Sequence, residues 1–338
     1  MKRELERISP LEAKEMFLRE RQTEVSAATL KANKYRVGHF VRWCKSEAID
    51  DLNELSGRDL HRFRLWRREE GDLNRVSLKT QMDTVRVFIR FCERIDAVRA
   101  DLHTTVVSPS LARNEDQRDV MLESDTAEEI LSHLRRFDYA SRGHIIMALL
   151  WHTGMRTGSL RALDVEDYHE EGEYVEVRHR PETDTPLKNK AEGERLVALS
   201  PSVCEVLDDW IETTRPDTRD EYGRNPFVST THGRAHTTTI RETVYRLTRP
   251  CVFAEGCPHD RSPESCESTN DAEQKASACP STVSPHAIRR GSITHFLTND
   301  VPNKVVSDRM NVCSSVLEKH YDQRSESVKM EQRREFIE

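Results

Sequence analysis

The chain has 338 residues, enough for two domains that each bury a hydrophobic core. Hydrophobic residues make up 36% and charged residues 33%, so the surface must be densely ionic. The longest apolar run, Ile145–Trp151, is far shorter than the roughly 20 residues that a membrane-spanning helix needs. Because no apolar stretch typical of a signal peptide follows Met1, we expect a cytoplasmic protein with no membrane contact and with reduced cysteines.

Charge is distributed unevenly along the chain. The formal net charge is −7, yet residues 1–100 contain 22 Lys and Arg against 17 Asp and Glu, whereas residues 101–338 contain 30 against 42. The basic first part favours a nucleic-acid partner. The chain also holds 40 arginines but only 12 lysines, and an acidic, lysine-poor composition is typical of salt-loving archaea.

The first hundred residues predict four helices. Residues 10–21 form a short first helix that opens on a proline. Ser26 and Ser56 are expected to cap the second and third helices, and the third should end near Gly71. Ser77 is expected to begin the fourth, which has a clear apolar face.

Arginines recur on the third and fourth of these helices. A solvated charged face is the ordinary explanation of such spacing. The functional alternative is a stripe that follows a DNA backbone, and the basic run on the third helix favours it. The candidate DNA-binding residues are Arg58, Arg62, Arg86, Arg90 and Arg94.

A helical domain is therefore expected over residues 1–105 and a linker over 106–118, which lacks sustained periodicity. Residues 119–338 predict a second domain that mixes helices with a small sheet. Its helices are expected at 124–137, 142–152, 201–214, 238–249 and through most of the tail from 284, and its strands at 173–178 and 195–199. Ser124 or Asp125 should cap the first of these helices, and Gly154 should end the second.

Three segments of the second domain carry groups suited to phosphate chemistry. They read Thr153-Gly154-Met155-Arg156, Ser284-Pro285-His286-Ala287-Ile288-Arg289 and Glu318-Lys319-His320-Tyr321. A phosphodiester under attack gains negative charge on its non-bridging oxygens, which fixed arginines stabilise well. His286 and Arg289 share one helical face in the first turn after the expected Ser284 cap, where a helix N-terminus itself favours phosphate.

In this order the segments resemble the tyrosine recombinase and phage integrase family, of the Xer-like type. The resemblance covers roughly residues 118–330, and the helical first part fits the family's SAM-like core-binding domain. It implies a mainly α fold with a small sheet in an α+β catalytic domain. It further implies site-specific breakage and rejoining of double-stranded DNA through a 3′-phosphotyrosyl intermediate, without a cofactor or metal, by a homotetramer that joins two duplexes.

The resemblance also assigns roles to individual residues. Tyr321 would be the nucleophile, Arg156 and Arg289 would hold the phosphate, and His286 would be a further catalytic residue. A lysine in the turn between the two strands would protonate the leaving 5′ oxygen, and we favour Lys188 over its neighbour Lys190.

Two positions depart from the family pattern. Asn311 lies near the place of a frequent histidine, where it can donate a hydrogen bond to a phosphate oxygen but cannot carry a proton. Ser159 replaces a common acidic residue three positions after Arg156, so Asp164 is the candidate that orients this arginine.

An insert at residues 251–279 contains Cys251, Cys257, Cys266 and Cys279 and few apolar residues. Four thiolates could hold a structural Zn²⁺, whereas a flexible loop with inert thiols and a redox-sensitive loop are the alternatives. The four other cysteines, Cys44, Cys92, Cys204 and Cys313, are interpreted as small buried residues.

Two other functions compete with catalysis. One is a catalytically inactive DNA-binding protein on the same fold, which the Asn311 substitution permits. The other is a zinc-finger-type regulator that reads DNA with the insert. The insert argues against the second alternative because its only basic residues are Arg261 and Lys275.

Overall fold

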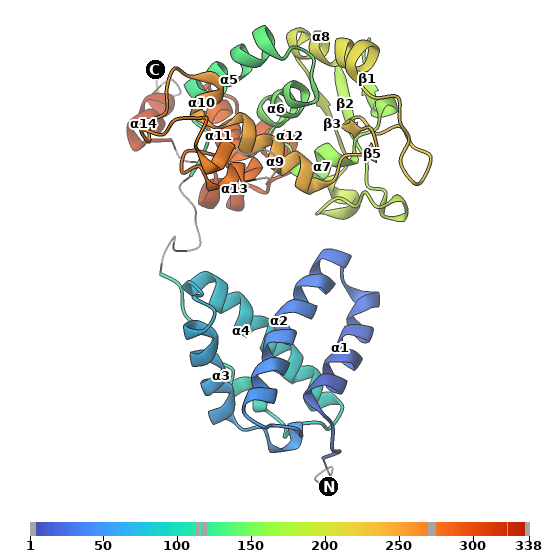
Figure 1. Cartoon of the computed structure of the whole chain (residues 1–338), viewed down its shortest axis with the longest axis vertical. Helices are drawn as coiled ribbons and strands as arrows, with labels where there is room; N and C mark the ends of the chain where they lie inside the picture. The colour runs from blue at the N-terminus through green and yellow to red at the C-terminus, as the bar shows by residue number, and fades with distance from the viewer. Residues whose placement is uncertain (1–4, 113–114, 116–119, 270–274, 323, 335–338) are drawn as a thin grey trace. The chain divides into compact units, whose positions relative to one another are not determined.

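The computed structural model of the chain describes residues 5–112, 115, 120–269, 275–322 and 324–334. The chain divides into two compact units, Met1–Arg118 and Asp119–Glu338, each with its own hydrophobic core (Figure 1). Among the described residues helices dominate and strands occur only in the second unit, which confirms the predicted fold class. Parts of the expected linker (113–114 and 116–118) and of the cysteine insert (270–274) lie outside the described residues.

Four long helices build the first unit: α1 (Pro10–Glu24), α2 (Ala27–Ser46), α3 (Gly57–Glu69) and α4 (Arg75–Arg94). Ser26 and Ser56 cap α2 and α3 as predicted, each accepting a backbone amide through its hydroxyl. The predicted start of α4 at Ser77 is wrong. Asn74 is its N-cap and accepts the amide of Ser77, because asparagine caps as well as serine and lies one turn earlier.

The core of the first unit is rich in aromatic rings. Phe40 packs against Phe63 and Phe88 from α3 and α4, with ring centroids 5.2 and 5.9 Å away. Val106, at the start of the expected linker, is buried in this core. Its carbonyl accepts hydrogen bonds from Arg86 Nε (3.2 Å) and Nη2 (2.7 Å), so this arginine fastens the chain that leaves the helices.

Helix α6 (Arg142–Thr153) is the buried centre of the second unit, which explains the apolar run of the sequence. It ends at Gly154 with φ of 57°, as predicted. Five helices pack against it: α5 (Ser124–Phe137), α7 (Thr157–Ala162), α8 (Pro201–Asp209), α9 (Thr237–Leu247) and α11 (Pro285–Thr298). The remaining helices are α10 (Pro250–Phe253), α12 (Asn303–Met310), α13 (Ser314–His320) and α14 (Glu326–Arg334).

The expected cap of α5 is wrong. Ser124 is the first helical residue rather than the cap, and Glu123 takes the N-cap position without a side-chain bond. The Ser124 hydroxyl instead bonds Nδ1 of His295 on α11, so a tertiary contact replaces the local one.

The sheet of the second unit has three antiparallel strands in the order β1 (Tyr168–His169), β2 (Tyr174–Val177) and β3 (Arg195–Ala198). Val175 pairs with Val197, and Val177 pairs with Arg195. A two-stranded ribbon of β4 (Ser229–Thr230) and β5 (Gly233–Arg234) lies apart from it. The long connection between β2 and β3 carries the two candidate lysines.

Candidate active site

Arg289 is the buried centre of the candidate site. It lies on α11, whose N-cap Ser284 accepts the amide of Ala287, and its side chain is only 1% exposed. Its Nη1 donates to the carbonyls of Gly154 (2.5 Å) and Met310 (2.8 Å). Its Nε and Nη2 are buried and make no well-formed hydrogen bond among the described residues, although Tyr321 lies near enough to oppose in part the lowering of the Arg289 pKa by burial and Arg156. A buried cation with free N–H groups is costly, and an anion bound there would remove that cost.

Close packing around Gly154 makes this arrangement feasible. The residue adopts the left-handed conformation, and an added Cβ would lie 2.6 Å from Sδ of Met310 on α12. Glycine therefore lets the end of α6 approach the end of α12. The two carbonyls that fix Arg289 come from these two helix ends.

Tyr321 follows α13 as its C-cap residue and is 6% exposed. Its hydroxyl lies 3.5 Å from Nε2 of His286, and the guanidinium carbon of Arg289 lies 5.4 Å from its ring centroid. The hydroxyl of Thr294 on α11 donates to the Tyr321 carbonyl at 2.9 Å, which fixes the backbone. Tyrosine, histidine and arginine, predicted from separate segments, therefore meet at one place.

The surroundings of His286 lower its pKa and so disfavour the protonated form. Loss of hydration on its packed side, followed by repulsion from Arg290 and Arg289, lowers its pKa to about 4, although part of the ring remains exposed. A neutral imidazole can accept a proton from a neighbouring hydroxyl or donate a hydrogen bond through its other nitrogen.

Arg156 is not oriented by Asp164. Its Nη1 donates to the main-chain carbonyl of Asn311 at 2.9 Å and to Oδ1 of the same residue at 3.2 Å. Asp164 is instead 4% exposed and pairs with Arg224 (2.6 Å) and Arg234 (2.5 Å). The sequence offered no means of deciding which arginine this carboxylate would select.

Asn311 joins three parts of the site. It ends α12 with φ of 50°, a left-handed conformation that asparagine tolerates. Its Oδ1 accepts Arg156 Nη1 and the side-chain amide of Asn189, and its Nδ2 donates to the carbonyl of Glu192 at 2.8 Å. The predicted hydrogen bond from this amide to a phosphate would have to compete with these protein partners.

The connection from β2 to β3 carries both lysines on its exposed part. Leu187 anchors it in the core, whereas Lys188 and Lys190 are exposed. Burial and repulsion from Arg290, Arg289 and Arg156 lower the pKa of His286, and the charge of Lys188 adds to this effect. Lys190 adopts φ of 52° at the first residue of the short helix Lys190–Gly193.

Two further arginines belong to this cluster and were not predicted. Arg195, at the start of β3, donates through Nε to the carbonyl of Arg309 at 2.7 Å, and Arg309 donates to the carbonyl of His152 at 2.9 Å. Burial, then repulsion from Arg289 and Arg156, lowers the pKa of Arg195 to about 10. Burial and then Arg156 lower the pKa of Arg289 to about 10. The signals were the position of Arg195 after the lysine turn and of Arg309 just before Asn311.

Within the described chain, no ion pair involves the four members of this open cluster, Arg156, Arg195, Arg289 and Arg309. Backbone carbonyls and one asparagine amide hold them instead. Four cations close together without a carboxylate form a site for an anion.

The five candidate DNA-binding arginines of the first unit have different environments. Arg86 donates a hydrogen bond to the Val106 carbonyl and forms an ion pair with Asp83. Arg62 forms an ion pair with Glu47, and Arg94 forms one with Glu20. Arg58 and Arg90 are exposed, and the described residues include no ion-pair partner for either. These two are the best placed of the five to contact a backbone phosphate.

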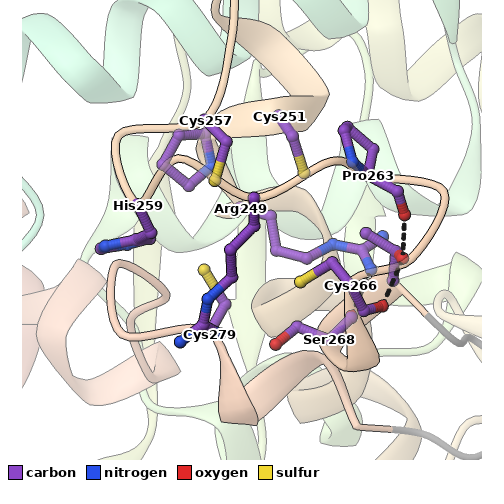
Figure 2. A pocket seen from close by; sticks show the side chains of 11 residues that line it. Arg249, Cys251, Cys257, His259, Pro263, Cys266, Ser268 and Cys279 are labelled. Carbon is purple, nitrogen blue, oxygen red and sulfur yellow. Dashed lines mark hydrogen bonds between the residues drawn. The ribbon is translucent and has the colours of Figure 1, made fainter.

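The four cysteines of the insert line one pocket, together with His259 (Figure 2). Within the described part of the chain, however, no group of three or more His, Cys, Asp or Glu side chains is placed to hold a metal ion. Of the remaining cysteines, Cys44, Cys92 and Cys204 are buried as predicted. Cys313 is exposed, so its predicted burial is wrong: it is the N-cap residue of α13.

Comparison with known proteins agrees with these observations. Residues 121–326 match the family model "Phage integrase family", and residues 17–95 match "Phage integrase, N-terminal SAM-like domain". The chain is 22% identical to the tyrosine recombinase XerD of Listeria monocytogenes over 84% of each chain. It is 24% identical to XerC of Corynebacterium glutamicum over 80% of this chain and 73% of that protein.

Two groups of solved structures share the fold. The Tn1549 transposon integrase in complex with transposon right end DNA matches 98% of this chain and 100% of that chain, with a TM-score of 0.67 and 14% identity. A lambda integrase dimer bound to a COC′ core site matches 96% of this chain and 77% of that chain, with a TM-score of 0.62 and 13% identity. No helix of the described residues is long and apolar enough to cross a membrane. The chain belongs to the phage integrase family of tyrosine recombinases, the enzymes that cleave and rejoin DNA.

Proposed function

We propose that Tyr321 attacks a phosphodiester of double-stranded DNA that is held by Arg289 and Arg156. The observation that carries this proposal is the buried Arg289, whose Nε and Nη2 make no well-formed hydrogen bond among the described residues while its guanidinium lies over the Tyr321 ring. A phosphate oxygen would satisfy these N–H groups and would be held next to the nucleophile.

The arginines would act chiefly on the transition state. Charge builds on the non-bridging oxygens as the tyrosine oxygen approaches the phosphorus, and fixed cations stabilise that charge without reorganising. Arg156 is fixed by Asn311 and Arg289 by two helix ends, so both are preorganised. The products of this step are a 3′-phosphotyrosyl bond and a free 5′ hydroxyl.

His286 would accept the proton of Tyr321 or hold the attacked phosphate. Its Nε2 lies 3.5 Å from the Tyr321 hydroxyl, which supports this role. Its lowered pKa makes it a poor base in the absence of DNA. A bound phosphate would offset the repulsion from the neighbouring arginines and raise that pKa, so base strength would increase when substrate arrives.

Lys188 is the proposed proton donor to the leaving 5′ oxygen. Lys188 is exposed on the connection between β2 and β3. The next residue, Asn189, donates a side-chain hydrogen bond to Oδ1 of Asn311. Asn311 is then a positioning residue, since one amide joins the lysine hairpin to the phosphate-binding Arg156. Lys190 is the alternative donor, and comparison of Lys188→Ala with Lys190→Ala distinguishes them.

The proposed partner is double-stranded DNA. The Tn1549 and lambda integrases of similar fold were solved with DNA, and the first unit here presents the exposed Arg58 and Arg90. Exchange of strands between two duplexes requires four attacking tyrosines, so we also propose a homotetramer. The chemistry stores the bond energy in the phosphotyrosine and needs no metal or nucleotide. Any metal in the cysteine insert would be structural.

Covalent trapping tests this proposal against the inactive DNA-binding alternative. Wild type, Tyr321→Phe and the control Tyr222→Phe, at an exposed tyrosine, are incubated with nicked or supercoiled DNA and denatured. We expect a protein–DNA adduct from wild type and the control only. Folded wild type that binds DNA and forms no adduct would instead support an inactive DNA-binding protein.

A further inference from the structure

The cysteine insert brings its four thiols to one pocket beside the start of α11. Cys251 comes from α10, and Cys257, Cys266 and Cys279 come from three successive turns. Figure 2 shows the four sulfur atoms facing a common space that the side chain of Arg249 also lines, whereas the ring of His259 points away from it. Residues spread over 29 positions of sequence are therefore gathered around one small volume.

Three of the four cysteines have the same local geometry. The carbonyls of Cys257, Cys266 and Cys279 each accept the amide three residues later, from Asp260 (3.1 Å), Thr269 (3.0 Å) and Thr282 (3.2 Å). Each cysteine thus opens a tight turn, which presents its thiol on the inside of the loop.

Apolar packing does not account for this arrangement. Between α10 and Val283 the described hydrophobic core includes only Ala276. Elsewhere in the chain, Cys44, Cys92 and Cys204 are buried within helices that have cores of their own. A segment with four inward thiols and almost no apolar side chains needs another source of order.

We propose that Cys251, Cys257, Cys266 and Cys279 bind one structural Zn²⁺ as thiolates. Zn–S bonds of about 2.3 Å in a tetrahedron require sulfur atoms about 3.8 Å apart. No group of described side chains already has the geometry of a metal site, so the proposal requires the turns to move together when the ion binds. We leave His259 out of the ligand set because its ring points away from the sulfur atoms, while its Nε2 is hydrogen-bonded to the hydroxyl of Ser281 at 2.9 Å (Figure 2).

The site is connected directly to the catalytic helix. The amide and hydroxyl of Thr282 both donate to the Cys279 carbonyl, and the amide of Val283 donates to Thr248 at the end of α9 (3.1 Å). Ser284, the cap of α11, follows at once, and His286 and Arg289 lie in the next turn. Zinc would therefore fix the first turn of α11, a consequence that rests on the proposed function.

Metal binding is tested first, without DNA. The full chain is purified under reducing conditions, stripped with a chelator and titrated with Co²⁺ and then Zn²⁺. We expect about one ion per chain, the visible absorption of tetrahedral cobalt–thiolate coordination, and displacement of cobalt by zinc. Folded wild type that shows no such absorption would overturn the proposal, and this measurement needs no variant.

Variants then identify the ligands. The double variant Cys257→Ser/Cys266→Ser should lose the cobalt–thiolate absorption, whereas the exposed control Cys313→Ser and His259→Ala should keep it. Equal loss in Cys313→Ser, or retention in the double variant, would contradict the assignment.

The link to α11 is tested with the DNA adduct. The metal-free chain should form it about tenfold more slowly than the zinc-loaded chain, because small displacements of catalytic groups have effects of this size or larger. Equal rates would overturn the link and leave the zinc site standing. Absence of any adduct with zinc bound would contradict the proposed function alone.

Discussion

The second unit contains two arginine clusters that differ in the groups with which their side chains pair. In the paired cluster, Arg180, Arg224 and Arg234 surround the carboxylates of Asp164, Asp167 and Asp220, with Arg234 2.5 Å from Asp164 and 2.7 Å from Asp220. In the open cluster, Arg156, Arg195, Arg289 and Arg309 are held by carbonyls and have no carboxylate in the described chain.

Arg180 of the paired cluster and Arg289 of the open cluster have pKa shifts of opposite direction. The hydrogen bond from Arg180 to Asp167 raises the pKa of this arginine, whereas burial and neighbouring Arg156 lower that of Arg289 to about 10. Buried N–H groups without a well-formed hydrogen bond among the described residues occur at Arg289 and Arg309, and none occurs at the three paired arginines. An external anion bound beside Tyr321 would satisfy the buried N–H groups of Arg289, whereas carboxylates of the protein already pair with the arginines of the paired cluster.

The largest expected effect is on catalysis by Arg289→Met. Loss of this cation should slow formation of the DNA adduct by about 10³-fold or more, as for other arginines that stabilise phosphoryl transfer. Single-turnover cleavage measures the rate. A reduction of only a few-fold would remove Arg289 from the role proposed here.

The matched change in the paired cluster, Arg234→Met, should reduce stability but have little effect on DNA cleavage. It leaves two buried carboxylates short of a partner, so the free energy of unfolding should fall by about 3 kcal/mol. Cleavage by the folded variant should remain within a few-fold of wild type. Denaturant titration gives the stability, and an unchanged midpoint would show that the pairing contributes little.

Binding of sulfate should distinguish the open cluster from the paired cluster through a smaller change in stability. At ten times its dissociation constant, an anion bound to the native state adds about 1.4 kcal/mol to stability. Wild type and Arg234→Met should both gain thermal stability with sulfate relative to chloride at equal ionic strength, and Arg289→Met should gain less. Equal gains in all three would place the anion elsewhere.

A smaller effect is expected for Asn311→Ala, which removes the amide between Arg156 and the lysine hairpin. Cleavage should slow by about tenfold because both groups lose a fixed position, while Asn311→Asp should preserve the contacts of Oδ1 and recover part of the rate. Identical rates for the two variants would argue that the amide has no positioning role.

The smallest expected effect concerns pH. His286 has a folded pKa of about 4, below its ordinary 6.5, so the unfolded chain binds more protons between these values. Stability contributed by neutral His286 is present above pH 6.5 and is lost as pH falls toward 4. The free energy of unfolding of wild type should therefore rise more steeply with pH over this window than that of His286→Gln. The same pH dependence in both proteins would contradict the shift.

The sequence predicted features that depend only on neighbouring residues, such as the ends of helices. Ser26, Ser56 and Gly154 mark helix ends because caps act within one turn. The order and spacing of the Arg156, His286–Arg289 and Tyr321 segments were enough to predict the family, and the structure brings Tyr321 to His286.

Long-range pairing could not be predicted in the same way. The hydrogen-bond partner of Arg156 is Asn311, which lies far along the chain. Asp164 pairs with Arg224 and Arg234 instead, and the sequence alone does not show which arginines fold next to it. Arg195 and Arg309 were missed since their sequence neighbourhoods resemble many solvated arginines. Only the folded chain shows that no carboxylate among the described residues pairs with them.

The central claim is that Tyr321 is the residue that becomes joined to DNA. The trapped adduct should be digested with nuclease and protease, and the peptide that carries a nucleotide should be sequenced by tandem mass spectrometry. We expect a nucleotide linked through its 3′ phosphate to Tyr321 and to no other residue. A nucleotide on a different side chain, or one linked through its 5′ phosphate, would contradict it.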